Sequence, residues 1–115
     1  MANALGEFEQ LVLLAVLRLG PNAYGVSIRR AIEDGTGRNV SAGAIYTTLM
    51  RLDGRGLVTS RVGETAPERT GQRRKYYEVQ PDGAAALYRA YSDVRNMSKG
   101  LIPRIAGLAA EADES

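Results

Sequence analysis

The sequence reads Val-Ser-Ala-Gly-Ala-Ile-Tyr-Thr-Thr-Leu-Met-Arg-Leu-Asp-Gly-Arg-Gly from residue 40 to residue 56, and this stretch decides the fold. The hydroxyl of Ser41 can accept a hydrogen bond from the unpartnered amides of a first helical turn, so it predicts a helix N-cap. Gly56 stands where a left-handed residue would end the helix. Between them one apolar stripe follows the 3.6-residue helical period, and it consists of Ile45, Leu49 and Leu52.

The opposite side of this predicted helix carries little charge for a face exposed to solvent. It begins with small residues and has its first charge near the C-terminal end; its members are Ala42, Gly43, Tyr46, Thr47, Met50 and Arg51. A helix whose N-terminus is small and partially positive can approach phosphates closely, which suits a DNA major groove. Taken alone, the pattern fits a plain amphipathic core helix equally well. The neighbouring segments decide between the two interpretations.

The composition excludes several classes of protein. With 115 residues the chain is one domain by size, and a chain this short often gains further burial by forming oligomers. It has no cysteine and no histidine, which removes disulfides, thiolate metal sites and the commonest general base. The longest apolar run, residues 11–17, is much shorter than a membrane span. We therefore expect a cytoplasmic protein with no cofactor, no metal and no membrane contact.

The positive charge is concentrated locally. The net charge is only +2, but the C-terminal residues Glu111, Asp113 and Glu114 account for three of the thirteen acidic side chains. Basic residues gather in one later segment, at Arg69, Arg73, Arg74 and Lys75. This distribution suits a polyanionic partner.

Two helices are predicted before residue 40. Residues 7–19 form the first, with acidic residues in its opening turn and Gly20-Pro21 after its end. Its apolar residues are too many for one face, so either the monomer covers it on several sides or a partner chain does. The second helix has a stripe of Tyr24, Ile28, Ala31 and Ile32 and is closed by glycines at 35 and 37.

After Gly56 the sequence changes to the two-residue period of strands. Residues 57–62 and 75–79 read as two short strands, with a polar, charged connection at 63–74. We therefore predict a mainly α fold with a small β-ribbon, a winged helix-turn-helix domain followed by a C-terminal dimerisation helix. In that architecture the third helix enters the major groove, and the basic wing straddles the backbone or the minor groove.

Four motifs in order resemble one known family. They are Leu-Gly-Pro-Asn-Ala-Tyr-Gly at 19–25, Val-Ser-Ala-Gly-Ala-Ile-Tyr-Thr-Thr-Leu-Met-Arg-Leu at 40–52, Gly-Leu-Val at 56–58 and Gly-Gln-Arg-Arg-Lys-Tyr-Tyr-Glu-Val-Gln-Pro-Asp-Gly at 71–83. Over residues 5–92 the chain is similar to the PadR family of bacterial transcriptional regulators, phenolic acid repressor-like winged helix proteins. The resemblance implies a homodimer that represses genes by binding double-stranded DNA at a palindromic operator. It also implies release by a small, often aromatic, effector.

The resemblance carries DNA-binding roles onto particular positions. On the third helix they fall on Ser41, Ala42, Gly43, Tyr46, Thr47 and Arg51, and on the wing they fall on Thr70, Gly71, Gln72, Arg73, Arg74 and Lys75. Tyr24 either donates to a phosphate or packs against the third helix. Thr47 stands where the family commonly has proline, and Gly71-Gln72-Arg73 where it commonly has Gly-Arg-Pro. A different target sequence is therefore expected, with DNA binding retained.

The segment from Pro81 reads as the dimerisation helix. Its apolar residues alternate at spacings of four and three, as in a coiled-coil seam, once Ser98 is counted: Leu87, Tyr91, Val94, Leu101, Ile105 and Leu108. We expect this seam to pack on a second protomer; the alternative is that the helix folds back on its own domain. Gly100 and Pro103 predict a kink or break near 100–103. The predicted division is 1–80 for the DNA-binding domain, 81–110 for the helix and 111–115 for a disordered acidic tail.

The resemblance places the dimer interface and an effector site on apolar residues of the first and last helices. These are Phe8, Leu11, Ala15, Leu87, Tyr88, Tyr91, Val94 and Leu101. The chain has no tryptophan, which departs from the branch of the family that stacks flat drugs between tryptophans. An enzyme is not expected, because no nucleophile and base pair or phosphate-binding glycine motif is present. The alternative function is a winged helix protein-interaction or adaptor module without sequence-specific DNA binding.

Overall fold

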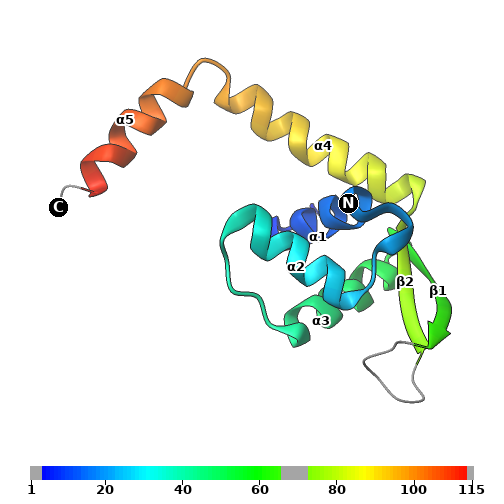
Figure 1. Ribbon diagram of the computed structural model, residues 1–115. Helices are drawn as coiled ribbons and strands as arrows, with labels where there is room; N and C mark the ends of the chain where they lie inside the picture. Colours follow the sequence, from blue (N-terminus) through cyan, green and yellow to red (C-terminus); the bar gives the residue numbers. More distant parts are fainter. Residues whose placement is uncertain (1–3, 66–72, 114–115) are drawn as a thin grey trace.

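The computed structural model describes residues 4–65 and 73–113, and the predicted fold class is confirmed (Figure 1). In chain order the elements are α1 (Glu7–Leu19), η1 (Gly20–Asn22), α2 (Gly25–Thr36), α3 (Ala42–Gly54), β1 (Val58–Thr65), β2 (Arg73–Val79), α4 (Pro81–Ser98) and α5 (Ile102–Asp113). We call the part from α1 to β2 the winged body. Within the described residues, no helix is both long and apolar enough to cross a membrane.

The core of the winged body lies between its three helices and the inner face of its sheet. The predicted stripe of α3 is buried as expected, with Ile45, Leu49 and Leu52 almost fully removed from solvent. Residues of α1 and α2 meet them, including Leu13 and Ile28. This burial supplies most of the stabilisation that holds α3 in place, because removing apolar surface from water is the dominant favourable contribution to folding.

Both ends of α3 have the caps that the sequence predicts. The Ser41 hydroxyl oxygen accepts a hydrogen bond from the amide of Ala44 at 3.0 Å. At the other end Gly56 has a φ of 74°, in the left-handed region. Its amide donates to the carbonyl of Asp53, and the amide of Leu57 donates to that of Leu52, both at 2.9 Å. This is a Schellman ending, and it turns the chain directly into β1.

The two strands of the wing pair antiparallel, with Val58 opposite Val79 and Arg61 opposite Tyr76. The segment between α1 and α2 lies along the free edge of β2. The Tyr77 amide donates to the Ala23 carbonyl at 2.8 Å, and Tyr24 forms an isolated bridge with Tyr76. The base of the wing is therefore attached to the start of α2.

The first turns of α4 pack against the winged body. Gly83 and Leu87 are buried, and a Cβ atom at Gly83 would collide with the carbonyl oxygen of Leu57. The prediction that the seam begins at Leu87 is therefore wrong, because this side chain belongs to the core of its own protomer. A regular apolar spacing predicts that a side chain is buried, but it does not show whether the winged body or a second protomer buries it.

The C-terminal helix breaks where glycine and proline predicted. Helix α4 ends at Ser98, Gly100 has a φ of 80°, and α5 starts again at Ile102. The break thus begins one residue before the expected range. Every residue of α5 is exposed, and in Figure 1 this helix lies apart from α1, α2, α3 and the sheet. The expectation of a disordered tail from Glu111 is wrong as far as Asp113, which is still helical; residues 114–115 lie outside the described residues.

Candidate nucleic-acid interface

The outer surface of α3 is open at its N-terminal end. Ala42, Gly43, Thr47 and Arg51 are exposed, and among the described residues no atom outside the backbone of α3 lies within 4 Å of a Cβ atom built at Gly43. Only Thr48 on the polar part of the helix is buried, and the sequence pattern did not predict this. The small exposed residues leave the partially positive N-terminus of α3 accessible to a close, negatively charged surface.

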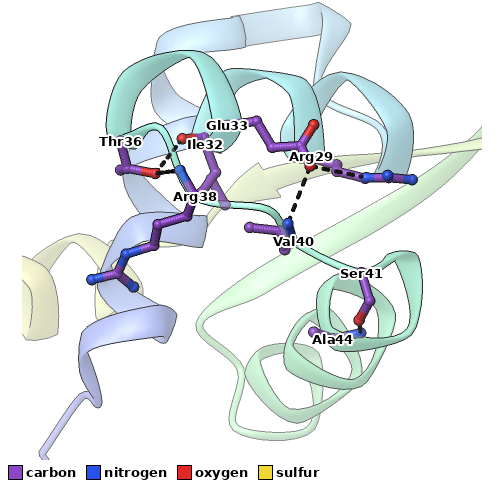
Figure 2. Close-up of polar contacts among 8 residues, drawn as sticks. All are labelled: Arg29, Ile32, Glu33, Thr36, Arg38, Val40, Ser41 and Ala44. Atoms are coloured by element: carbon purple, nitrogen blue, oxygen red, sulfur yellow. Dashed lines mark hydrogen bonds and ion pairs between the residues drawn. The ribbon is translucent and has the colours of Figure 1, made fainter.

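The connection between α2 and α3 is fixed by side chains of α2, as Figure 2 shows. The carboxylate of Glu33 accepts from the Val40 amide at 3.1 Å and pairs with Arg29 at 3.5 Å. The Thr36 hydroxyl donates to the Ile32 carbonyl at 2.7 Å and accepts a hydrogen bond from the Arg38 amide at 3.2 Å. These contacts satisfy backbone groups of the turn and so determine the angle at which α3 leaves it.

The N-terminus of α1 is paired with arginines before and after α3. Arg38, in the connection between α2 and α3, pairs with Glu7 at 2.9 Å in an exposed position. Arg55, just after α3, pairs with Glu9 at 3.5 Å, and Glu9 also accepts from the Gly6 amide at 2.8 Å. The exposed pair contributes little to stability, whereas Glu9 is largely buried and its contacts replace lost hydration.

Tyr46 is exposed on one side and packed on the other. A Cβ atom at Gly25 would lie only 2.8 Å from the Tyr46 hydroxyl oxygen, so the ring sits directly over the first turn of α2. Glycine at position 25 permits this close approach. The ring of Tyr46 thus has a fixed position on the candidate surface.

Alternation along β2 divides the basic residues of the wing between two faces. Arg73 and Lys75 are exposed, whereas Arg74 and Tyr76 are half-buried. The guanidinium carbon of Arg74 lies 4.1 Å from the centroid of the Tyr24 ring. The other predicted wing contacts, Thr70, Gly71 and Gln72, lie outside the described residues. The basic cluster seen in the sequence is therefore not one uniform surface.

The ring of Tyr24 packs against the wing. Its centroid is 5.7 Å from that of Tyr76, with the two planes at 71°. The ring of Tyr24 therefore packs against the wing and not, as one of its two predicted roles had it, against α3; phosphate contact by its hydroxyl stays a prediction. The reason is the edge pairing of this segment with β2, which joins residues about fifty positions apart and leaves no local signal in the sequence.

Tyr77, on the inner face of β2, is buried among residues of the winged body. Burial raises the pKa of its hydroxyl above the ordinary value, with smaller contributions from Tyr46 and Asp53. The group is therefore neutral over the physiological range.

The residues predicted for the dimer interface fall into two groups. Ala15 and Leu87 are buried in their own protomer, and Phe8 and Leu11 are half-buried against the same core. By contrast, Tyr88, Tyr91, Val94 and Leu101 are exposed. Two residues of α1 that the prediction omitted are also exposed, Leu14 and Leu17. Their apolar character was visible in the sequence, but the side of α1 on which they lie was not.

The fold and the open surface of α3 beside the wing define a winged helix-turn-helix protein. Residues 13–89 match the model of the Transcriptional regulator PadR-like family, so the chain belongs to this family. It is a transcriptional regulator that acts by binding DNA.

Solved structures of other family members have the same fold. A PadR family regulator from Clostridium difficile has a TM-score of 0.66 and 22% identity, over 87% of this chain and 99% of that chain. One from Eggerthella lenta has a TM-score of 0.64 and 24% identity, over 86% of each chain. A PadR-like regulator from Bacillus cereus has a TM-score of 0.66 and 20% identity, over 86% and 90%. No match is found among curated proteins.

Proposed function

We propose that the protein is a repressor that binds a palindromic operator as a homodimer, with α3 in the major groove and the wing on the adjacent backbone. One observation carries the proposal: the capped, uncluttered N-terminal end of α3 is exposed next to a wing whose Arg73 and Lys75 are also exposed. A groove-binding helix needs such an end, and phosphate contacts need free basic side chains.

Residues on α3 divide into positioning and reading roles. The amides after Ser41 favour a phosphate, and Ala42 and Gly43 allow the helix to come close to it. Thr47 and Arg51 lie farther along the exposed side, where a hydroxyl and a guanidinium can contact base edges. Arg51 suits a guanine, because its two terminal nitrogens match the O6 and N7 acceptors.

The homodimer proposal rests on the exposed apolar residues of the C-terminal helices and of α1. On α4, on α5 and in the break between them they are Tyr88, Tyr91, Val94, Met97, Leu101, Ile102, Ile105 and Leu108. Leu14 and Leu17 of α1 offer a second apolar strip. So large an apolar surface is unusual for a monomer, and a second copy would bury it. Two copies related by a two-fold axis would present two α3 helices to half-sites roughly 34 Å apart.

We further propose that a small aromatic effector binds between the protomers, next to the exposed rings of Tyr88 and Tyr91. Such a ligand would release the operator only if it binds the DNA-competent spacing of the two α3 helices less well than another spacing. The family resemblance suggests the chemical class, and the two tyrosines supply aromatic surface for it.

Selection of bound duplexes from a random library tests the proposal. The purified full chain is incubated with the library at physiological salt, and the winning duplex is then titrated against a scrambled duplex. Enrichment of an inverted repeat with half-sites about one turn apart supports a dimeric, sequence-specific regulator. Equal binding of both duplexes would reduce the function to non-specific association, and binding of neither would favour the protein-interaction alternative.

Repression is tested with the same sequence. A promoter that carries the selected repeat should lose transcription when the protein is added to a purified transcription system. Thr47→Ala together with Arg51→Ala serves as the control, because both side chains are exposed and their loss leaves the fold intact. Unchanged or increased transcription with the wild-type chain would contradict the repressor assignment.

A further inference from the structure

Four side chains form a continuous stack across the base of the wing. The Arg74 guanidinium lies 4.1 Å from the centroid of Tyr24, and the Tyr24 ring meets Tyr76 edge to face at 5.7 Å between centroids. The Arg61 guanidinium lies 4.6 Å from the centroid of Tyr76. We call Arg74, Tyr24, Tyr76 and Arg61 the arginine–tyrosine stack. Cations over aromatic faces and perpendicular ring pairs are both attractive arrangements.

The register of the sheet explains why these residues meet. Tyr24 bridges to Tyr76 on one side, and Arg61 is opposite Tyr76 on the other, so all three side chains lie on the same face. Arg74 is two residues from Tyr76 on the same strand and therefore shares this face. Arg73 and Lys75 point to the other face, where they are exposed.

The stack connects the wing to the start of α2. Tyr24 is the residue immediately before α2, and Arg61 donates to the carbonyl of Pro21 in η1 at 3.4 Å. On the wing side the Tyr76 ring covers Gly63, where a Cβ atom would collide with it. Any change in the angle of the wing relative to the helices must break contacts in this stack.

We propose that the arginine–tyrosine stack sets the angle of the wing, and that within it Arg74 is a positioning residue while Arg73 and Lys75 make the phosphate contacts. This inference deepens the proposed function and rests on it. Arg73, Arg74 and Lys75 are consecutive and carry the same charge, but they have different roles in this proposal. A guanidinium held on a ring face retains its charge but has less freedom to follow a phosphate.

The dependence of DNA affinity on salt separates the two roles. Each phosphate contact releases counterions and contributes about 0.9 to the slope of log affinity against log salt. Arg73→Ala and Lys75→Ala should each reduce the slope by about that amount. Arg74→Ala removes the same charge one position from each of them. It should weaken binding by about tenfold with an unchanged slope, because the wing is misplaced. Arg73→Ala and Lys75→Ala are thus matched controls for Arg74→Ala.

Variants of Tyr24 test the stack from its other side. Tyr24→Phe keeps the ring and loses the hydroxyl, so it should bind DNA nearly as well as the wild type. Tyr24→Leu removes the ring face and should weaken binding by about tenfold, as Arg74→Ala does. The double variant Tyr24→Leu, Arg74→Ala should be little weaker than either single variant, because both break the same contact.

The stack is also measured without DNA, by NMR of the folded full chain. Side-chain protons of Arg74 over the Tyr24 ring should resonate upfield, remain upfield in Tyr24→Phe and return to ordinary positions in Tyr24→Leu. Two results would overturn the inference while leaving the proposed function intact: a slope reduced by Arg74→Ala as much as by Lys75→Ala, or Tyr24→Phe as weak as Tyr24→Leu. Absence of duplex binding by the wild type would instead overturn the proposed function itself.

Discussion

In the winged body, Leu49 and Leu52 of α3 are 0% exposed, whereas in the C-terminal helices Val94 is 64% and Ile105 51% exposed. Both sets are apolar residues at helical spacing, and the sequence alone treats them alike. The difference is that the winged body closes a core with its own elements, while most of α4 and all of α5 stay exposed within the part of the chain that the structure describes. One region is thus complete in a single chain, and the other presents an apolar surface that a second copy would bury.

We expect the largest effect from the same leucine-to-alanine substitution made in each of the two regions. Leu52→Ala should lower the free energy of unfolding by about 2–5 kcal/mol, because it leaves a cavity in a closed core. Leu108→Ala removes the same atoms from an exposed site of α5 and should change it by less than about 0.5 kcal/mol in dilute solution. Chemical denaturation followed by circular dichroism measures both. Equal losses at low protein concentration would show that Leu108 is packed as closely as Leu52 in the single chain.

A pair of glycine substitutions tests where the boundary between the regions lies. Gly83→Ala should destabilise by about 1–3 kcal/mol, since the new methyl group collides with the Leu57 carbonyl oxygen. Gly107→Ala, in the open part of α5, should stabilise by up to about 1 kcal/mol, because alanine is the better helix former. Thermal unfolding of the two variants is the measurement. Destabilisation by Gly107→Ala would mean that α5 is packed closely in solution.

The helix cap of α3 gives a smaller effect. Ser41→Ala should lower stability by about 1 kcal/mol, because the Ala44 amide loses its acceptor. Thr47→Ala, on the exposed side of the same helix, should stay within about 0.5 kcal/mol of the wild type. Urea titrations compare the two. A loss with Thr47→Ala as large as with Ser41→Ala would show that the outer side of α3 is not free.

The smallest effect is a pH dependence specific to the closed core. Burial raises the pKa of Tyr77 above the ordinary value of 10.0, so the folded state favours its neutral form. The stabilisation is fully present below pH 10 and is lost as the pH rises through the raised pKa. Denaturation at pH 8.5 to 11 should show less alkaline loss in Tyr77→Phe than in the wild type. Identical pH dependence of stability in the two proteins would show that the Tyr77 hydroxyl is hydrated in the folded state.

Much of the winged body could be predicted because its signals are local. The Ser41 cap, the stripe from Ile45 to Leu52 and the terminating Gly56 all lie within one stretch, and each is confirmed. The break of the C-terminal helix was predictable for the same reason, since Gly100 acts on the backbone where it stands.

Contacts between distant segments could not be predicted. Leu87 continues a regular apolar period, and only the packing of α4 on the body shows which surface it meets. Arg74 was grouped with Arg73 and Lys75 because they are adjacent. Arg74 lies on the opposite face of β2 from Arg73 and Lys75, because side chains alternate along a strand. The bridge from Tyr24 to Tyr76 then brings an aromatic ring to Arg74, and no short window of sequence contains both segments.

We propose that the exposed apolar surface of the C-terminal helices joins two winged bodies on one operator. The most direct test is the number of chains bound per selected duplex, by sedimentation velocity, for the wild type and for Val94→Asp with Ile105→Asp. We expect two wild-type chains on an inverted repeat, and variant chains that remain folded but are monomeric and bind the repeat much more weakly. A variant that still sediments as two chains per duplex with wild-type affinity would contradict it.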